Sequence, residues 1–218
     1  MARTKVQNRT GLTVLSGARL AECPDRPRPW KSSDAAAAAE DFLSRSRKAG
    51  PRKAAVRELM GELCSGDPFD HRCAAEVARL VSRREAGILA GYGDVLAEVA
   101  AELPMEEWQA RGYVLVAAAH NAMTRSQRMR LLPLVRARLA EDRIAVRAMA
   151  LEAFAILAAH EAELRDEALE MLEKERHSSI PAMRSRAKLM LPVVMGLAVQ
   201  AEAASPQKHG RRPSAARD

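Results

Sequence analysis

The sequence predicts an all-α fold in which pairs of helices stack side by side into a curved solenoid. Two observations lead to this prediction. Aromatic residues make up only 3% of the 218 residues, and alanine, leucine, arginine and glutamate dominate, a composition that favours packed helices over strands. A helix-pair pattern also recurs along the chain, and one such pair cannot bury its apolar faces alone. We therefore expect about four stacked helix pairs and no sheet.

Residues 1 to 50 are expected to form a flexible, basic arm with one short helix near 35 to 48. Glycine and proline interrupt any helix before residue 34, and residues 1 to 53 carry a net charge of +7. Asp34 can cap the short helix. Trp30 is interpreted as an anchor that holds the arm on the folded body or on a partner.

Residues 52 to 198 are expected to form the repeat domain. Four arginines, spaced by 39, 36 and 37 residues, each open an apolar helix that another helix precedes: Arg72, Arg111, Arg147 and Arg184. The four helix pairs are accordingly predicted at 52 to 84, 88 to 121, 127 to 160 and 164 to 198. Residues 199 to 218 are expected to be a disordered basic tail.

The third pair carries the most specific sequence pattern. Its markers are Leu131-Leu132-Pro133, Asp142, Val146-Arg147, and the series Ala150, Phe154 and Leu157. This unit resembles a HEAT repeat of the armadillo-like class, and the other three units match the pattern less fully. The resemblance implies a right-handed α-α superhelix and a structural role for Asp142 and Arg147 across the turn. Independently, helical periodicity places Phe154 on a buried apolar stripe.

Charge and cysteine usage narrow the class of protein. The body from 54 to 200 has a net charge of −2 and the tail from 201 to 218 has +2, so the basic character lies at the ends. Cys23, Cys64 and Cys73 form no C-x-x-C pair, which indicates neither a disulfide framework nor a zinc site. No run of residues is long and apolar enough to cross a bilayer. We expect a cytoplasmic, bacterial protein without membrane contact.

The sequence indicates no catalytic site, no metal site and no cofactor. It lacks a Walker loop, an H-E-x-x-H helix and a G-x-S-x-G elbow. Trp108 and Arg111 faintly resemble the opening of a helix in the alkylpurine DNA glycosylases, a group of HEAT-like enzymes, but the further aromatic residues and carboxylate of their lesion pocket have no counterpart. A glycosylase-like enzyme is therefore the third hypothesis.

The leading hypothesis is a noncatalytic scaffold or adaptor that binds a protein or peptide on its concave face. Solenoids commonly present the second helix of each pair there, and these helices carry small and apolar residues opposite their core stripes. The predicted partner-binding residues, with Trp108 as the anchor, are Trp108, Gly112, Val116, Glu152 and Ala155. A close-packed superhelix, the arm or a second copy could instead cover this face.

The alternative hypothesis is a nucleic-acid-binding protein. The basic ends and an arginine-rich third unit favour it, because a polyanion is bound by positive charges that converge on its backbone. Its predicted binding residues are Arg125, Arg128, Arg130, Arg136 and Arg138. On a helical wheel these arginines do not form one stripe, which also fits a solvated outer surface.

Overall fold

The computed structural model describes residues 31 to 65 and 67 to 204. The regular structure of these residues is entirely helical, which confirms the predicted all-α class. The α-helices are α1 (Ser32–Arg45), α2 (Ala49–Leu63), α3 (Pro68–Arg84), α4 (Gly93–Glu102), α5 (Trp108–Asn121), α6 (Arg125–Leu139), α7 (Ile144–His160), α8 (Ala162–Arg176) and α9 (Pro181–Ala204). Trp30, Cys23 and most of the predicted arm and tail lie outside the described residues.

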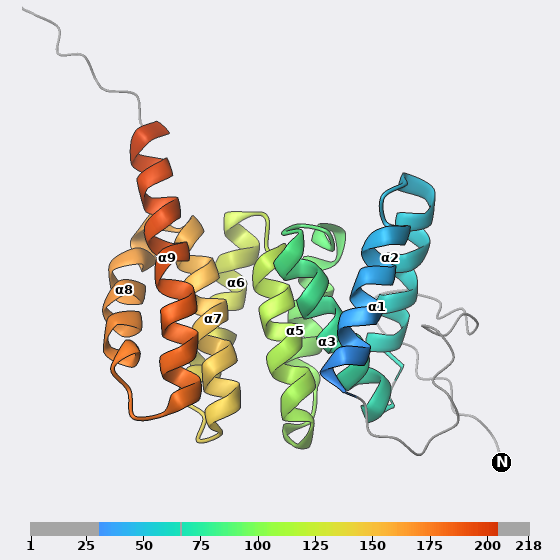
Figure 1. Ribbon diagram of the computed structural model, residues 1–218, viewed down its shortest axis with the longest axis horizontal. Coiled ribbons are helices and arrows are strands. Elements are labelled where there is room, and N and C mark those ends of the chain that lie inside the picture. Colours follow the sequence, from blue (N-terminus) through green and yellow to red (C-terminus); the bar gives the residue numbers. More distant parts are fainter. Residues whose placement is uncertain (1–30, 66, 205–218) are drawn as a thin grey trace, which may run out of the picture.

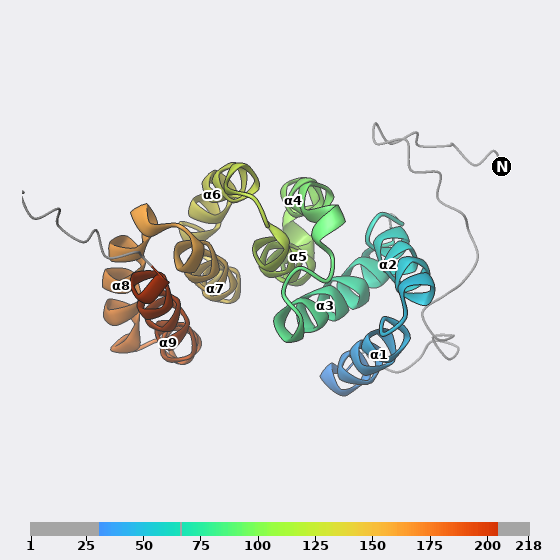
Figure 2. The same cartoon turned by 90° about the horizontal axis from the view of Figure 1, so that it is seen from above.

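The helices are arranged in two rows. In the first row, α1, α3, α5, α7 and α9 each contact the next member, and in the second row, α2, α4, α6 and α8 each pack against the helix that follows in sequence. Figure 1 shows the first row in front, and Figure 2 shows from above that it follows an arc with its concave side away from the second row. We call this concave side the inner face.

Polar side chains define several helix starts. The Asp67 carboxylate accepts hydrogen bonds from the Phe69 and Asp70 amides, at 2.8 and 3.4 Å, and Pro68 occupies the first helical position of α3, a combination typical of helix starts. Thr124 and Gln127 cap α6 reciprocally. Asp34 lies inside the first turn of α1 rather than at its cap, and accepts a hydrogen bond from the Lys31 amide.

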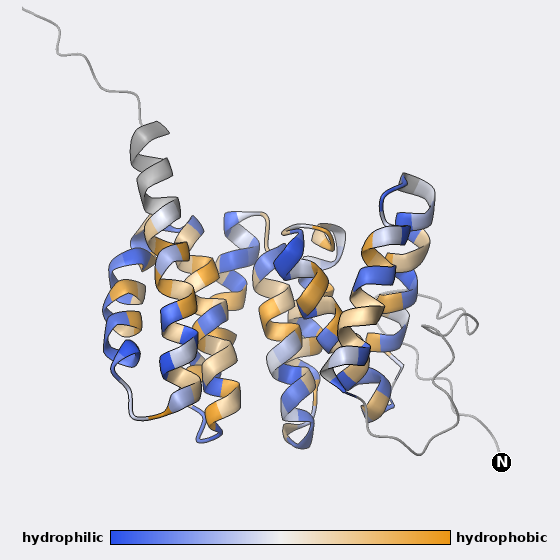
Figure 3. Ribbon diagram, in the orientation of Figure 1, coloured by the Kyte–Doolittle hydropathy of each residue, from blue (hydrophilic) through white to orange (hydrophobic). Residues whose placement is uncertain are grey.

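Helix α7 is the centre of the core. It contacts α5, α6, α8 and α9, and thirteen of its residues are buried. In Figure 3 much of its ribbon therefore has the orange and tan shades of apolar residues. Phe154 is completely buried, as its apolar stripe predicts. Because α5, α6, α8 and α9 cover most of its surface, α7 has no amphipathic pattern of the kind that marks a surface helix.

A buried amide joins α3, α5 and the segment before α4. The Asn121 side chain is completely buried. Its Nδ2 donates to the Ser82 hydroxyl at 2.8 Å and to the Ala117 carbonyl at 2.7 Å, and its Oδ1 accepts from the Leu89 amide at 2.7 Å. Gly87, with a φ of 79°, makes the turn that precedes Leu89. A buried amide is tolerated when its hydrogen bonds are satisfied, as they are here.

The helix boundaries differ in detail from the predicted pairs. The helix expected from residue 88 begins at Gly93, after the turn at Gly87 and a 3-10 turn at Ala90–Tyr92. At the other end, α9 continues to Ala204, past residue 198, where the predicted repeat domain ends. The short helix expected near 35 to 48 corresponds to α1 (Ser32–Arg45). These shifts arise at glycine turns and helix ends, where local sequence constrains the backbone least.

Candidate binding face

Charged side chains follow one stripe of α3. Arg72, Glu76, Arg79 and Arg83 are separated by four, three and four residues, which places them on one side of a helix. Arg83 reaches Glu152 on α7. Because α4 packs against α5 and α6 packs against α7 in the second row, a side chain of α3 can reach α7 only across the inner face. The stripe therefore lies on the inner face.

Glu152 is the centre of this face. Its side chain is only 1% exposed, and its two carboxylate oxygens contact two arginines, Oε1 with Arg83 of α3 and Oε2 with Arg186 of α9. A buried carboxylate is stable only when charge and hydrogen bonds compensate for its lost hydration. One carboxylate of α7 thus ties together three members of the first row.

Arg79 and Tyr113 form the second part of the face. The Arg79 guanidinium lies over the Tyr113 ring, 4.8 Å from its centroid, a stacking geometry that guanidinium groups favour. Burial, and next the neighbouring Arg83, lower the pKa of Arg79. Burial, and next the Glu76 carboxylate, raise the pKa of the Tyr113 hydroxyl, whereas Arg79, Arg72 and Arg186 act in the opposite direction. Side chains from α3, α5 and α9 therefore converge around Tyr113.

His120 lies two turns after Tyr113 on α5 and is held neutral. Burial is the largest cause that lowers its pKa, to about 4. Arg83 and His160 lower it further, whereas Glu152 raises it. At neutral pH the imidazole therefore adds no positive charge to the inner face.

The depressed pKa of His120 is expected to make the protein less stable in acid. The unfolded chain binds this proton near pH 6.5 and the folded chain only near pH 4, so stability is lost as the pH falls between these values. The full difference corresponds to about 3 kcal/mol. Urea unfolding measures the free energy of unfolding of wild type and His120→Gln at pH 7 and at pH 4.5. This free energy should fall from pH 7 to pH 4.5 by about 2 kcal/mol less in the variant than in wild type. An equal loss of unfolding free energy in wild type and His120→Gln would refute this role of His120. An equally reduced loss in the control His177→Gln, whose imidazole is exposed, would refute it as well.

The five predicted partner-binding residues do not form an open surface. Val116, Glu152 and Ala155 are completely buried and Gly112 is buried as well, which agrees with the alternative that close packing covers this face. Trp108 is partly exposed at the start of α5, with the Arg143 guanidinium 5.1 Å from its ring centroid. Neighbouring helices pack over Gly112, Val116 and Ala155, and the arginines that pair with Glu152 cover its carboxylate. Partner binding by Trp108 stays a prediction.

Gly112 serves close packing between α5 and α7. A methyl group at this position would meet the Met149 side chain at its sulfur. Although alanine favours a helix over glycine, Gly112→Ala is expected to destabilise the protein by about 1 kcal/mol because the Met149 side chain must leave its packed position. Gly61→Ala is the matched control, since Gly61 lies in α2 with open space around it, and should stabilise by about 0.5 to 1 kcal/mol. Chemical denaturation that ranks the two variants equally would contradict this role.

The five arginines of the nucleic-acid hypothesis all contact acidic side chains. Four of the pairs join α6 to another part of the fold, and Arg138 pairs within the same turn. The closest contacts are Arg125–Glu163 at 2.8 Å, Arg128–Glu161 at 2.7 Å, Arg130–Asp94 at 2.7 Å, Arg136–Glu167 at 2.7 Å and Arg138–Glu141 at 2.7 Å. Since a carboxylate offsets each guanidinium, the helix offers little net positive charge to a phosphate backbone.

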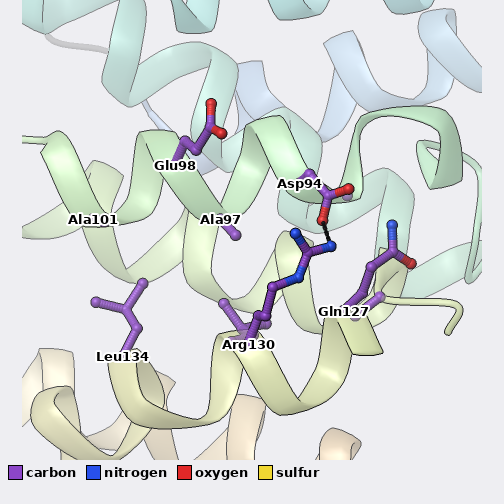
Figure 4. Close-up of a pocket in the computed structure, with 10 residues that line it drawn as sticks. Asp94, Ala97, Glu98, Ala101, Gln127, Arg130 and Leu134 are labelled. Carbon is purple, nitrogen blue, oxygen red and sulfur yellow. Dashed lines mark hydrogen bonds and ion pairs between the residues drawn. The ribbon is translucent and has the colours of Figure 1, made fainter. Parts of the chain in front are cut away.

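One of these pairs crosses a shallow pocket in the second row. The pocket lies between α4 and α6 and has a volume of about 250 Å³. Figure 4 shows Arg130 of α6 reaching across to Asp94 of α4, with Gln127 beside them. The remaining lining is mostly alanine, leucine and glycine. This arrangement joins two helices and presents no convergent set of reactive groups.

The turn between α6 and α7 is also held by an ion pair. Arg111, 3% exposed, contacts Glu141 at 3.0 Å, and Arg138 contacts the same carboxylate. The arginine that opens α5 is thus linked to the turn of the next helix pair. The resemblance to HEAT repeats assigned the acidic role in this turn to Asp142. Asp142 is exposed, and the acid that contacts Arg111 is the preceding residue, Glu141.

Sequence reasoning singled out Glu152 but missed Arg79, Arg83, Tyr113 and Arg186. The regular spacing of charged residues on α3 was one available signal. The other was Glu152 itself, the one acid inside the largely apolar helix α7, because such a charge needs basic partners. Neither signal identifies which arginines come from which helix.

Among residues 31 to 65 and 67 to 204, no helix meets the length and hydropathy needed to cross a bilayer, and no three His, Cys, Asp or Glu side chains are grouped as metal ligands would be. Cys64 is a free, half-buried thiol. In comparisons of the chain with protein families, with curated proteins and with solved structures, none gives a match.

Proposed function

We propose that this chain is a HEAT-like helical-repeat protein that acts as a noncatalytic scaffold and binds a protein or peptide partner on its inner face. The observation that carries the proposal is the convergence of Arg79, Tyr113 and Arg186 from α3, α5 and α9 on one surface. Surfaces assembled from successive repeats are the usual binding sites of solenoid proteins. The right-handed superhelix and the cytoplasmic location are part of the same proposal.

Two features of the fold support this proposal. The inner row is continuous from α1 to α9, because each member contacts the next, so an extended partner can lie across several helices. The aromatic and guanidinium groups on the inner face are also residue types that recur at the energetic centres of protein interfaces. The buried positions Val116 and Ala155 then act indirectly by supporting the helices that carry these groups.

Site-specific photocrosslinking in the native host tests the proposal. A photoreactive amino acid replaces Gln109, one turn before Tyr113 and partly exposed, or Ala137, which is exposed on α6 in the second row. We expect a discrete protein adduct from position 109 that position 137 does not give. The same purified partner should then bind the wild-type chain directly. Adducts that are identical at both positions, or none from position 109, would contradict an inner binding face.

A further inference from the structure

We propose that the partner of the inner face presents an acidic segment, whose carboxylates bind at an arginine cluster formed by Arg72, Arg79, Arg83 and Arg186. This inference rests on the proposed function, since it specifies the chemistry of the partner for the same face. It concerns charges that the fold brings together from α3 and α9.

The arginine cluster has more positive charge than its acidic neighbours balance. Among the described residues, the acids beside these four guanidinium groups are Glu152, which pairs with Arg83 and Arg186, and Glu76, which lies near Arg79 and one turn after Arg72 on α3. Glu152 is already in contact with two arginines and is too buried to turn outward. Glu76 is buried as well, with its carboxylate 3.9 Å from Arg79. An incoming carboxylate would supply negative charge that these two acids do not provide within the described part of the chain.

The arginine cluster also has donors that the fold leaves unused. Nε of Arg72 and Nε of Arg79 are among the buried side-chain donors of the described residues that have no hydrogen-bond acceptor. Unsatisfied buried donors are rare in folded proteins and are costly when nothing compensates them. A small shift of these side chains toward a bound carboxylate would give them an acceptor, so binding relieves a local cost.

The arginine cluster is ordered before any partner arrives. Arg79 is stacked on Tyr113, and Arg83 and Arg186 are held by Glu152. Burial lowers the pKa of both Arg79 and Arg186, which indicates that these cations have lost part of their hydration. Preordered and partly dehydrated cations bind an anion with a smaller loss of side-chain entropy and with less screening by water.

The extent of the cluster favours an acidic protein segment over nucleic acid. A nucleic-acid backbone places a phosphate at every nucleotide and needs positive charge along its whole path. Here the arginine cluster extends only over α3 and α9 around Tyr113, whereas the arginines of α6 are each offset by an acid. A few carboxylates on a short peptide match this confined charge.

The test uses the full chain and a defined probe. Fluorescence anisotropy measures binding of a labelled peptide of alternating glutamate and glycine, of its glutamine–glycine counterpart, and of a single-stranded DNA of equal charge. The test variant combines Arg72→Gln and Arg79→Gln, because substitution of Arg83 or Arg186 would uncover the buried Glu152. The control is Arg136→Gln, an exposed α6 arginine paired with Glu167. Thermal melts confirm that both variants are folded.

We expect the glutamate peptide to bind the wild-type chain at least about tenfold more tightly than the glutamine peptide does. The double variant should lose at least about tenfold in affinity for the glutamate peptide, whereas Arg136→Gln should keep the wild-type affinity. Equal binding of the two peptides, or full binding by the double variant, would overturn the inference. Tighter, arginine-dependent binding of the DNA would overturn it in favour of nucleic acid. If the probe at position 109 still captures a protein, only the acidic chemistry fails and the proposed function stands.

Discussion

Truncation of Phe154 to alanine is expected to destabilise the protein by about 3 to 5 kcal/mol. The ring is completely buried in α7, the helix that contacts α5, α6, α8 and α9. Its removal loses apolar burial and leaves a cavity that four surrounding helices cannot easily close. Thermal or urea unfolding followed by circular dichroism measures the loss.

Ile144→Ala is the matched control for this prediction. Ile144 opens the same helix but is 43% exposed, so its truncation should cost about 1 kcal/mol or less. A Phe154→Ala variant that unfolds at the wild-type denaturant concentration would show that α7 is not the centre of the core.

Replacement of Glu152 by alanine is expected to destabilise the protein by about 3 kcal/mol. Breaking a buried ion pair typically costs about 3 to 5 kcal/mol because the remaining charge has no partner. Here the remaining charges are Arg83 and Arg186, whose side chains are 27% and 23% exposed. Water can hydrate them in part, so the expected value is at the lower end of this range. Denaturant unfolding at neutral pH provides the measurement.

Two further variants separate charge from packing at Glu152. Glu152→Gln keeps the shape of the side chain and removes only its charge, and should lose most of the same stability if the two arginines require a carboxylate. Glu167→Ala removes one side of the Arg136 ion pair, whose members are about half exposed, and should cost at most about 1 kcal/mol. Equal effects of Glu152→Ala and Glu167→Ala would contradict the central role of Glu152.

The sequence allowed the helices to be predicted because their signals are local. Periodic apolar positions and the recurring arginines act within a few residues of themselves. The burial of Phe154 followed from its stripe in the same way. Boundaries were less accurate, as the 3-10 turn before Gly93 and the extension of α9 to Ala204 illustrate.

The candidate binding face was predicted less well because it depends on contacts between helices that do not follow one another in the sequence. Val116 and Ala155 belong to sequences that suit an open apolar surface, yet both are buried. The arc of the first row lets Arg83 of α3 extend past α5 to Glu152 of α7. The sequences of α3 and α7, taken separately, do not specify this contact. The offsetting acids of the α6 arginines were missed for the same reason, since most of them lie on other helices.

The sequence by itself determined that the chain is all-α, where its helices lie approximately, and that Phe154 is in the core, since these depend on periodicity and composition. Only the tertiary structure decided which charges meet. Arg79, Arg83 and Arg186 became one cluster because α3 and α9 approach Glu152 from two sides, while the arginines of α6 were offset by acids of α4, α8 and adjoining turns. Electrostatic interactions act through space, so their partners are set by the way the helices stack.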